Sequence, residues 1–248
     1  MSEGEHMPFR TEDGRPLDEL LLAERPADGY RFELRAGFVY EDPVSGRRYP
    51  VRAGRVTDLA SVPMSLWGFI ASYGRQSAPA VLHDDRSAAA AELGDRRSAL
   101  AQRREDDRVF RSALREQGVP LLRAWLMWGW VAADREREFA GAAGVVFMVQ
   151  AVVGALVVVG ASVAAFWQPA WLLLALLPAL AAVPWRGLAP LMLLLNYSSA
   201  VLTPLVVLHL VALAPFRLVE ALVELVTGGD PAGVLRPTLH PPSAPPEE

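Results

Sequence analysis

Residues 54–63, GRVTDLASVP, lie where the sequence changes from a strand pattern to helix patterns. Upstream, YRFELRAGFVYED at residues 30–42 alternates apolar and charged side chains, which is the two-residue period of a half-buried strand. Proline and glycine then mark a turn at residues 43–46, after which the alternation resumes. We therefore expect an antiparallel hairpin or small sheet over residues 30–57.

Downstream of this stretch the pattern becomes helical. One helix is expected to begin with Ser77 as its N-cap, to carry AVLHDDRSA at residues 80–88 and to end near Gly94. A charged helix is expected over residues 97–117, and Pro120 begins the next helix. Strands followed by helices in one segment predict an α+β fold.

The composition divides the chain into a charged half and an apolar half. Residues 1–140 hold 21 of the 24 basic residues and 23 of the 28 acidic residues. A soluble head followed by a membrane-embedded region explains this distribution better than a single soluble domain does. We expect five parts: a loosely ordered arm (1–28), a soluble α+β head (29–140), a transmembrane region of about three helices (141–216), an amphipathic helix (217–227) and a disordered Pro-rich tail (228–248).

The apolar half contains three candidate spans. Residues 142–167 carry no charge and exceed the roughly 20 residues that a spanning helix needs. Residues 169–185 are close to the lower limit for a span, and residues 187–216 are long enough to span with tilt. Only WQPAW, residues 167–171, separates the first two segments, so these are expected to form a helical hairpin.

Arginine positions predict the orientation in the membrane. Arg135 and Arg137 precede the first span and Arg186 follows the second, whereas the turn at Gln168 is uncharged. Positive residues concentrate on the cytoplasmic side of membrane proteins. We therefore expect a multi-pass protein of the cell (inner) membrane with a cytoplasmic head, whose first partner is the lipid bilayer.

Other classes of protein are disfavoured by composition. The chain has no Cys, which excludes thiolate metal sites, thiol catalysis and disulfides. The head is close to charge balance and lacks the basic excess of a nucleic-acid-binding domain, so no nucleic-acid partner is expected. The polar first 30 residues lack the apolar core of a signal peptide, and no cleaved leader is expected. In the arm, only LDELLLAE at residues 17–24 favours a short helix.

Three sequence blocks carry a family resemblance. They are GRVTDLASVP at residues 54–63, AVLHDD at residues 80–85 and EDDRVFRSALREQGVP at residues 105–120. In order and content they resemble the bacterial and phage domain-of-unknown-function family 1353 over about residues 30–135. The positions that match its motifs are Thr57, Asp58, Ala60, Ser61, Val62, Pro63, His83, Asp84, Asp107 and Phe110.

The resemblance implies the fold of the head and a bacterial or phage origin, but no activity, because the family has none established. Two features depart from the family pattern. Residues 85–87 read Asp-Arg-Ser where the family has a Leu-Tyr pair after the His-Asp pair, and the apolar half lies outside the family domain.

A metal site is one hypothesis for the motif residues. His83 and Asp84 are adjacent on one helix, Asp107 lies on another, and Asp58 lies at a helix entrance. One imidazole with carboxylates suits Zn, Mn or Fe, and a bound water would be activated for hydrolysis. The candidate ligands of one divalent metal ion are therefore His83, Asp84, Asp107 and Asp58.

A metal-free catalytic site uses overlapping residues. Asp58 would orient His83 as a general base, and Ser61 would be the nucleophile, although no Gly-x-Ser-x-Gly elbow surrounds it. A structural role is the alternative to both. Asp58 and Ser61 would accept backbone N–H groups at a helix start, Asp84 would pair with an arginine, and His83 would be a buried histidine paired with a carboxylate.

Two functions therefore remain open. The first is a membrane-tethered metal-binding or hydrolase-like domain with a site at Asp58, His83, Asp84 and Asp107. The second is a non-catalytic membrane-anchored scaffold, or a phage- or envelope-associated interaction module, that binds a protein partner or a second copy of itself.

Overall fold

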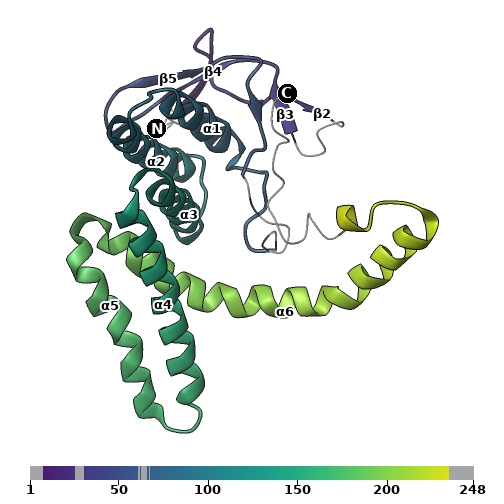
Figure 1. Cartoon of the computed structure of the whole chain (residues 1–248). Helices are drawn as coiled ribbons and strands as arrows, with labels where there is room; N and C mark the ends of the chain where they lie inside the picture. The colour runs from purple at the N-terminus through teal and green to yellow at the C-terminus, as the bar shows by residue number, and fades with distance from the viewer. Residues whose placement is uncertain (1–7, 26–30, 61, 63–65, 67, 235–248) are drawn as a thin grey trace, which may run out of the picture.

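The structure is a computed structural model that describes residues 8–25, 31–60, 62, 66 and 68–234 (Figure 1). Ser61 and Pro63 of the first motif lie outside the described residues. So does the larger part of the expected Pro-rich tail, from residue 235 onward.

Two small antiparallel sheets form the N-terminal part of the head, which confirms the α+β prediction. One sheet has the order β1-β4-β5 and the other β2-β3-β6. The strands of the described residues are β1 (Phe9–Thr11), β2 (Leu22–Arg25), β3 (Arg31–Leu34), β4 (Phe38–Glu41), β5 (Arg48–Val51) and β6 (Val56–Thr57).

The β4–β5 hairpin has the register that the alternating pattern requires. Phe38 pairs with Val51 and Tyr40 pairs with Tyr49, and all four side chains are buried on one face. Side chains two residues apart share a face of a strand, so this pairing buries the whole apolar set at once. The face packs against Phe9 and against apolar residues of the first two helices, including Val81, Leu82, Val109 and Ala113.

The N-terminal arm supplies two strands. β1 pairs with β4 and β2 pairs with β3, both antiparallel. The short helix expected over residues 17–24 is therefore wrong, because the second half of that segment is strand β2. Leu17, Leu20 and Leu22 pack against the core of the sheets, and this pairing with a distant segment outweighs local helix propensity.

Three helices complete the head (Figure 1): α1 (Ser77–Ala91) and α2 (Arg96–Glu116), which pack on the sheets, and α3 (Leu121–Phe139), which packs on α2. Gln76, not Ser77, is the N-cap of α1, and the Ser77 hydroxyl accepts the Gly74 N–H at 3.0 Å instead. Gly118 adopts φ +72° after α2, as a helix C-terminus favours, and Pro120 precedes α3.

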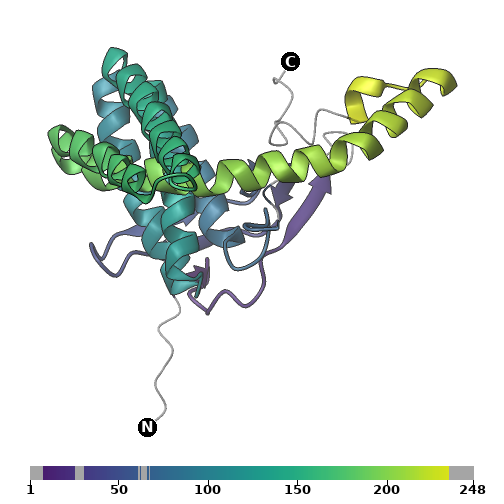
Figure 2. The same cartoon turned by 90° about the horizontal axis from the view of Figure 1, so that it is seen from below.

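Helix α4 (Ala142–Ala164) leaves the head and is followed by an antiparallel return segment. This segment consists of the 3-10 helix η3 (Pro169–Leu176), the helix α5 (Leu177–Ala182) and the 3-10 helix η4 (Val183–Leu188). Helix α4 and the return segment lie side by side and point away from the head, so the expected hairpin forms (Figures 1 and 2). The last helix, α6 (Ala189–Thr227), leaves the base of the hairpin sideways.

The second and third expected spans belong to one continuous helical run, Pro169–Thr227. The run is kinked at Arg186, where φ is +51° and ψ is −112°. Residues 217–227, which were expected as a separate amphipathic helix, are the last part of α6. The base of the hairpin packs on the head through a buried cluster that includes Ala132, Ala133, Phe147, Ala151, Leu191 and Met192.

Candidate functional site

A chain of buried polar contacts crosses the three helices of the head. His83 Nε2 on α1 lies 2.9 Å from Asp107 Oδ1 on α2, and the other Asp107 oxygen accepts a hydrogen bond from Arg135 Nη1 on α3. Asp107 is fully buried, and His83 and Arg135 are 8% and 3% exposed. Because a carboxylate only accepts hydrogen bonds, the imidazole donates from Nε2.

The chain of contacts continues along α3. Arg135 donates from Nε and Nη2 to Glu136 Oε1, at 3.1 and 2.9 Å. Glu136 is 2% exposed and lies 3.3 Å from the Arg104 guanidinium on α2. His83, Asp107, Arg135, Glu136 and Arg104 therefore form one network, which we call the cross-brace. Its α3 residues lie in the last turns before α4 begins.

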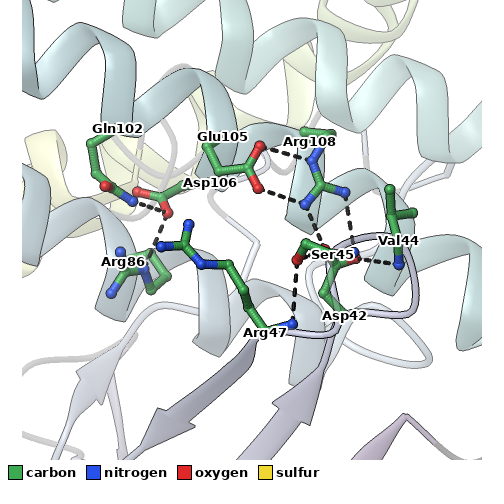
Figure 3. Close-up of polar contacts among 9 residues, drawn as sticks. All are labelled: Asp42, Val44, Ser45, Arg47, Arg86, Gln102, Glu105, Asp106 and Arg108. Carbon is green, nitrogen blue, oxygen red and sulfur yellow. Dashed lines mark hydrogen bonds and ion pairs between the residues drawn. The ribbon is translucent and has the colours of Figure 1, made fainter.

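The two adjacent acids of α2 point to different partners. Asp107 joins the cross-brace, whereas Asp106 Oδ1 accepts from Arg86 Nε at 3.1 Å and from Gln102 Nε2 at 2.8 Å (Figure 3). Burial raises the pKa of Asp106, and the nearby charge of Arg86 only partly offsets this effect. Consecutive helical side chains diverge by about 100°, and this places Asp106 and Asp107 in different hydrogen-bonded groups.

A second polar group joins the β4–β5 turn to α2 (Figure 3). Asp42 accepts a 2.6 Å hydrogen bond from Arg108, which also pairs with Glu105 at 2.6 Å. Burial alone would raise the pKa of Asp42, but the hydrogen bonds from Arg108 and Ser45 lower it below its ordinary value. The sequence motifs do not contain Asp42 or indicate Arg108 as a site residue, and only the three-residue spacing of Glu105 and Arg108 indicates the helical half of this group.

Asp84 lies apart from His83 although the two are neighbours in sequence. Its Oδ2 accepts a hydrogen bond from the Thr57 hydroxyl at 2.5 Å. The pKa of Asp84 is raised well above its ordinary value, first by burial and then by the negative charge of Asp58. Arg103, a buried arginine of α2, acts in the opposite direction and does not restore the ordinary value.

The turn at residues 57–60 belongs to the motif GRVTDLASVP, and a side-chain hydrogen bond from Thr57 connects it to helix α1. Thr57 Oγ1 accepts the Leu59 N–H at 2.8 Å while its hydroxyl donates to Asp84. Leu59 is buried and has φ +62°, a conformation that costs a non-glycine residue on the order of 1 kcal/mol or more. Thr57 therefore both holds this strained turn and fixes the side chain of Asp84.

The structure groups the predicted site residues in two pairs. His83 contacts Asp107, and Asp84 lies close enough to Asp58 for the charge of one to shift the other. Among the described residues, no three His, Asp or Glu side chains come together in an arrangement that could hold a metal ion. Ser61 lies outside the described residues, so its expected role as a nucleophile stays a prediction.

The comparison with protein families agrees with the resemblance seen in the motifs. Residues 32–131 match the model of a family described as "Protein of unknown function (DUF1353)". The match runs from β3 into α3 and contains both pairs of site residues, whereas α4 and all later helices lie outside it. No curated protein and no solved structure matches the chain significantly.

Proposed function

We propose that the chain is an integral membrane protein in which the α4 hairpin anchors a non-catalytic α+β interaction module to the bilayer. One observation carries the proposal: the two longest apolar helical runs are mostly exposed. Within their most apolar stretches, only 28% of residues in α4 and 6% in Pro169–Thr227 are buried inside the chain. An apolar core helix of a soluble protein would be covered on most sides, and exposed apolar patches of this size mark membrane or partner contacts.

The dimensions of α4 fit a bilayer. Its 23 residues extend for roughly 35 Å at about 1.5 Å per residue, compared with a hydrocarbon core of about 30 Å. Trp167 and Trp171 are exposed at the distal turn of the hairpin, and Trp185 lies at the base. Tryptophan is enriched at both membrane interfaces, so the two ends of the hairpin carry the residue type expected there.

The orientation follows from charge. The base of the hairpin adjoins the charged head, and Arg186 is exposed there, whereas the distal turn at Gln168 is uncharged. By the positive-inside rule, the head faces the cytoplasm and the turn faces the other side. The partners of this proposal are the bilayer and a protein that binds the head, which is either a different chain or a second copy.

The buried polar residues of the head bind one another, and this supports a non-catalytic role for the head. In the cross-brace, His83 Nε2 and both oxygens of Asp107 are occupied by contacts inside the chain, so they are not presented to a substrate. The network instead connects α1 and α2 to the end of α3, which leads through Gly141 into α4. This geometry suits a module whose orientation is fixed relative to the membrane helices.

Membrane extraction tests the anchor. The full chain is expected to stay in the membrane pellet after washes with high salt and alkaline carbonate, because burial of exposed apolar helices in lipid does not depend on charge. A chain ending after residue 140 is expected to leave the pellet. Release of the full chain by carbonate would exclude an integral membrane protein.

A hydrolase-like or metal-binding site at Asp58 and Asp84 is the second candidate function. The observation that favours it is the raised pKa of Asp84 beside a second carboxyl group, the pattern of a proton donor in acid–base catalysis. The same two carboxyl groups would be the protein ligands of a divalent ion. Metal content of the purified full chain before and after Asp84→Asn checks the metal form of this candidate.

Asp84→Asn is expected to raise the melting temperature at pH 7–8 by about 2–4 °C. The folded-state pKa of Asp84 is raised, so the stabilising protonated form is fully populated below the unfolded-state pKa and is lost as pH rises through the folded-state pKa. Asparagine keeps an oxygen for the Thr57 hydroxyl and has no charge to desolvate. The gain should shrink toward acidic pH in thermal unfolding of the detergent-solubilised chain.

The matched control is Asp85→Asn on the same helix. Asp85 pairs with Arg55 at 2.5 Å, so its neutralisation removes an ion pair and is expected to leave the melting temperature unchanged or lower it. A lower melting temperature for Asp84→Asn at neutral pH would show that the Asp84 carboxylate stabilises the fold through an ion pair. Asp84 would then not be a carboxyl group that the fold favours in its protonated form.

A further inference from the structure

An arginine-rich pocket lies where the head meets the base of the hairpin. Its volume is about 490 Å³, which is within the range of small-molecule sites. The head supplies four arginines, Arg104, Arg108, Arg111 and Arg135, together with Trp128, and η4 supplies Trp185, Gly187 and Leu188. Three of these arginines lie on one face of α2, because residues 104, 108 and 111 are four and three positions apart.

The arginines of the pocket differ in how their charges are compensated. Arg108 is held by Asp42 and Glu105, and Arg135 is held by Asp107 and Glu136. These two form fixed walls of the pocket. Arg104 has only a longer contact of 3.3 Å with Glu136, and half of its side chain is exposed.

Arg111 has no carboxylate partner among the described residues. Its guanidinium instead lies over the rings of Trp125 and Trp128, at 4.3 and 4.9 Å from their centroids. Burial, and then the nearby charge of Arg108, lower the pKa of Arg111. A partly buried cation that is destabilised by its surroundings gains most from an external anion, and its stacked ring partners hold it in a fixed position to receive one.

The pocket lies at the level where the proposed membrane begins. Trp185 donates from Nε1 to Gln150 of α4 at 3.0 Å and contacts the Phe147 ring edge-on at 5.0 Å, so it is fixed to the hairpin at its head end. An indole held at this end of a spanning hairpin belongs in the headgroup layer. Further along α4, exposed apolar side chains such as Val152, Val153 and Leu156 offer a surface for acyl chains.

We propose that this pocket binds the phosphate of an anionic phospholipid, with Arg104 and Arg111 as the arginines that contact it. A guanidinium matches the oxygens of a phosphate with paired hydrogen bonds, and anionic lipids concentrate at the cytoplasmic leaflet. The inference rests on the proposed membrane anchor, since it needs the pocket at headgroup level. It adds that the head is held against the membrane by a specific lipid as well as by the hairpin.

The test uses the full chain purified in a neutral maltoside detergent. Mixed micelles with phosphatidylglycerol are expected to raise the melting temperature in a saturable way, whereas micelles with phosphatidylcholine or buffer with inorganic phosphate are not. Native mass spectrometry counts the bound lipid. Arg111→Gln is expected to weaken binding of phosphatidylglycerol by about tenfold, which is the effect of about 1.4 kcal/mol.

Control variants separate binding from folding. Arg104→Gln changes a half-exposed side chain whose one contact in the cross-brace is that with Glu136 at 3.3 Å, and it should also weaken binding if Arg111→Gln fails to fold. Arg52→Gln removes an exposed arginine of the head that does not line the pocket and should bind like the unmodified chain. Melting in phosphatidylcholine alone reports whether each variant is folded.

Two results would overturn the inference. Equal binding of phosphatidylglycerol by the Arg104 and Arg111 variants and the unmodified chain would place the lipid elsewhere. Equal stabilisation by inorganic phosphate would assign the pocket to a soluble anion. Either result leaves the anchor standing if the chain still resists carbonate extraction, so failure of the lipid site and failure of the anchor are distinguishable.

Discussion

Asp107→Ala is expected to lower the free energy of unfolding by about 3–5 kcal/mol. Asp107 is fully buried and accepts hydrogen bonds from both His83 and Arg135. Alanine would leave the Arg135 charge buried with Glu136 as its remaining partner, and it would leave the His83 ring without an acceptor. Removing one member of a buried charge network costs far more than the network contributes as a whole.

Thermal unfolding of the detergent-solubilised chain measures this effect, with an expected fall of roughly 10 °C in melting temperature. Asp134→Ala is the matched control, because Asp134 is an acid of α3 whose side chain is half exposed and pairs with Arg137 on the surface. It should change stability by less than about 1 kcal/mol. Similar losses for the two variants would mean that the cross-brace does not hold the helices together.

Gly144→Ala is expected to cost about 3 kcal/mol or more and to disturb the junction of α3 and α4. A Cβ at this position would lie 2.0 Å from the Glu136 carbonyl oxygen and 2.9 Å from its carbon. Both are backbone atoms, so no side chain can move aside. Gly141, with φ +61°, makes the turn that brings the two helices this close. Head and hairpin would therefore have to separate at the cross-brace residue Glu136.

Gly160→Ala on the same helix is the control for this substitution. A Cβ at Gly160 meets no atom within 4 Å, so the change should be neutral or stabilise the helix by up to about 1 kcal/mol. Both variants are compared by melting temperature and by the amount of folded protein recovered in detergent. Equal behaviour of the two would show that α3 and α4 are not in close contact.

The parts of the fold that the sequence predicted depend on neighbours in the chain. The turn at residues 43–46, with alternation that resumes at Tyr49 and Val51, predicted a hairpin here because the two strands lie on either side of one turn. The segment at residues 17–24 was assigned to a helix, since nothing local shows that Leu22 pairs with Leu34 in a sheet. Local propensity is overruled where a strand finds its partner elsewhere in the chain.

The candidate site was predicted in part for the same reason. Of the predicted site residues, His83 contacts Asp107, whereas Asp84, which was expected in the same group, contacts Thr57. Arg135 was interpreted only as an orientation signal for the membrane. Its role in the cross-brace depends on packing of α2 against α3, which brings it to Asp107 across 28 positions of sequence.

The cross-brace and the proposed lipid pocket share Arg104 and Arg135. The same arginines therefore belong both to the packing of the head helices and to the proposed lipid contact. In the proposed function, polar residues that resembled a catalytic set instead orient the surface that faces the membrane. Asp58 and Asp84 lie outside this arrangement, so any chemistry of the head is to be sought at these two residues.

The central claim is that α4 crosses the membrane with the head on the cytoplasmic side, and single-cysteine labelling tests it most directly. The chain has no native Cys, so Val44→Cys in the exposed turn of the head and Gln168→Cys in the distal turn of the hairpin each give one reactive site. In intact cells, a membrane-impermeant maleimide is expected to label Gln168→Cys at once and Val44→Cys only after permeabilisation. Equal labelling of both positions before permeabilisation, or protection of Gln168→Cys until permeabilisation, would contradict the account.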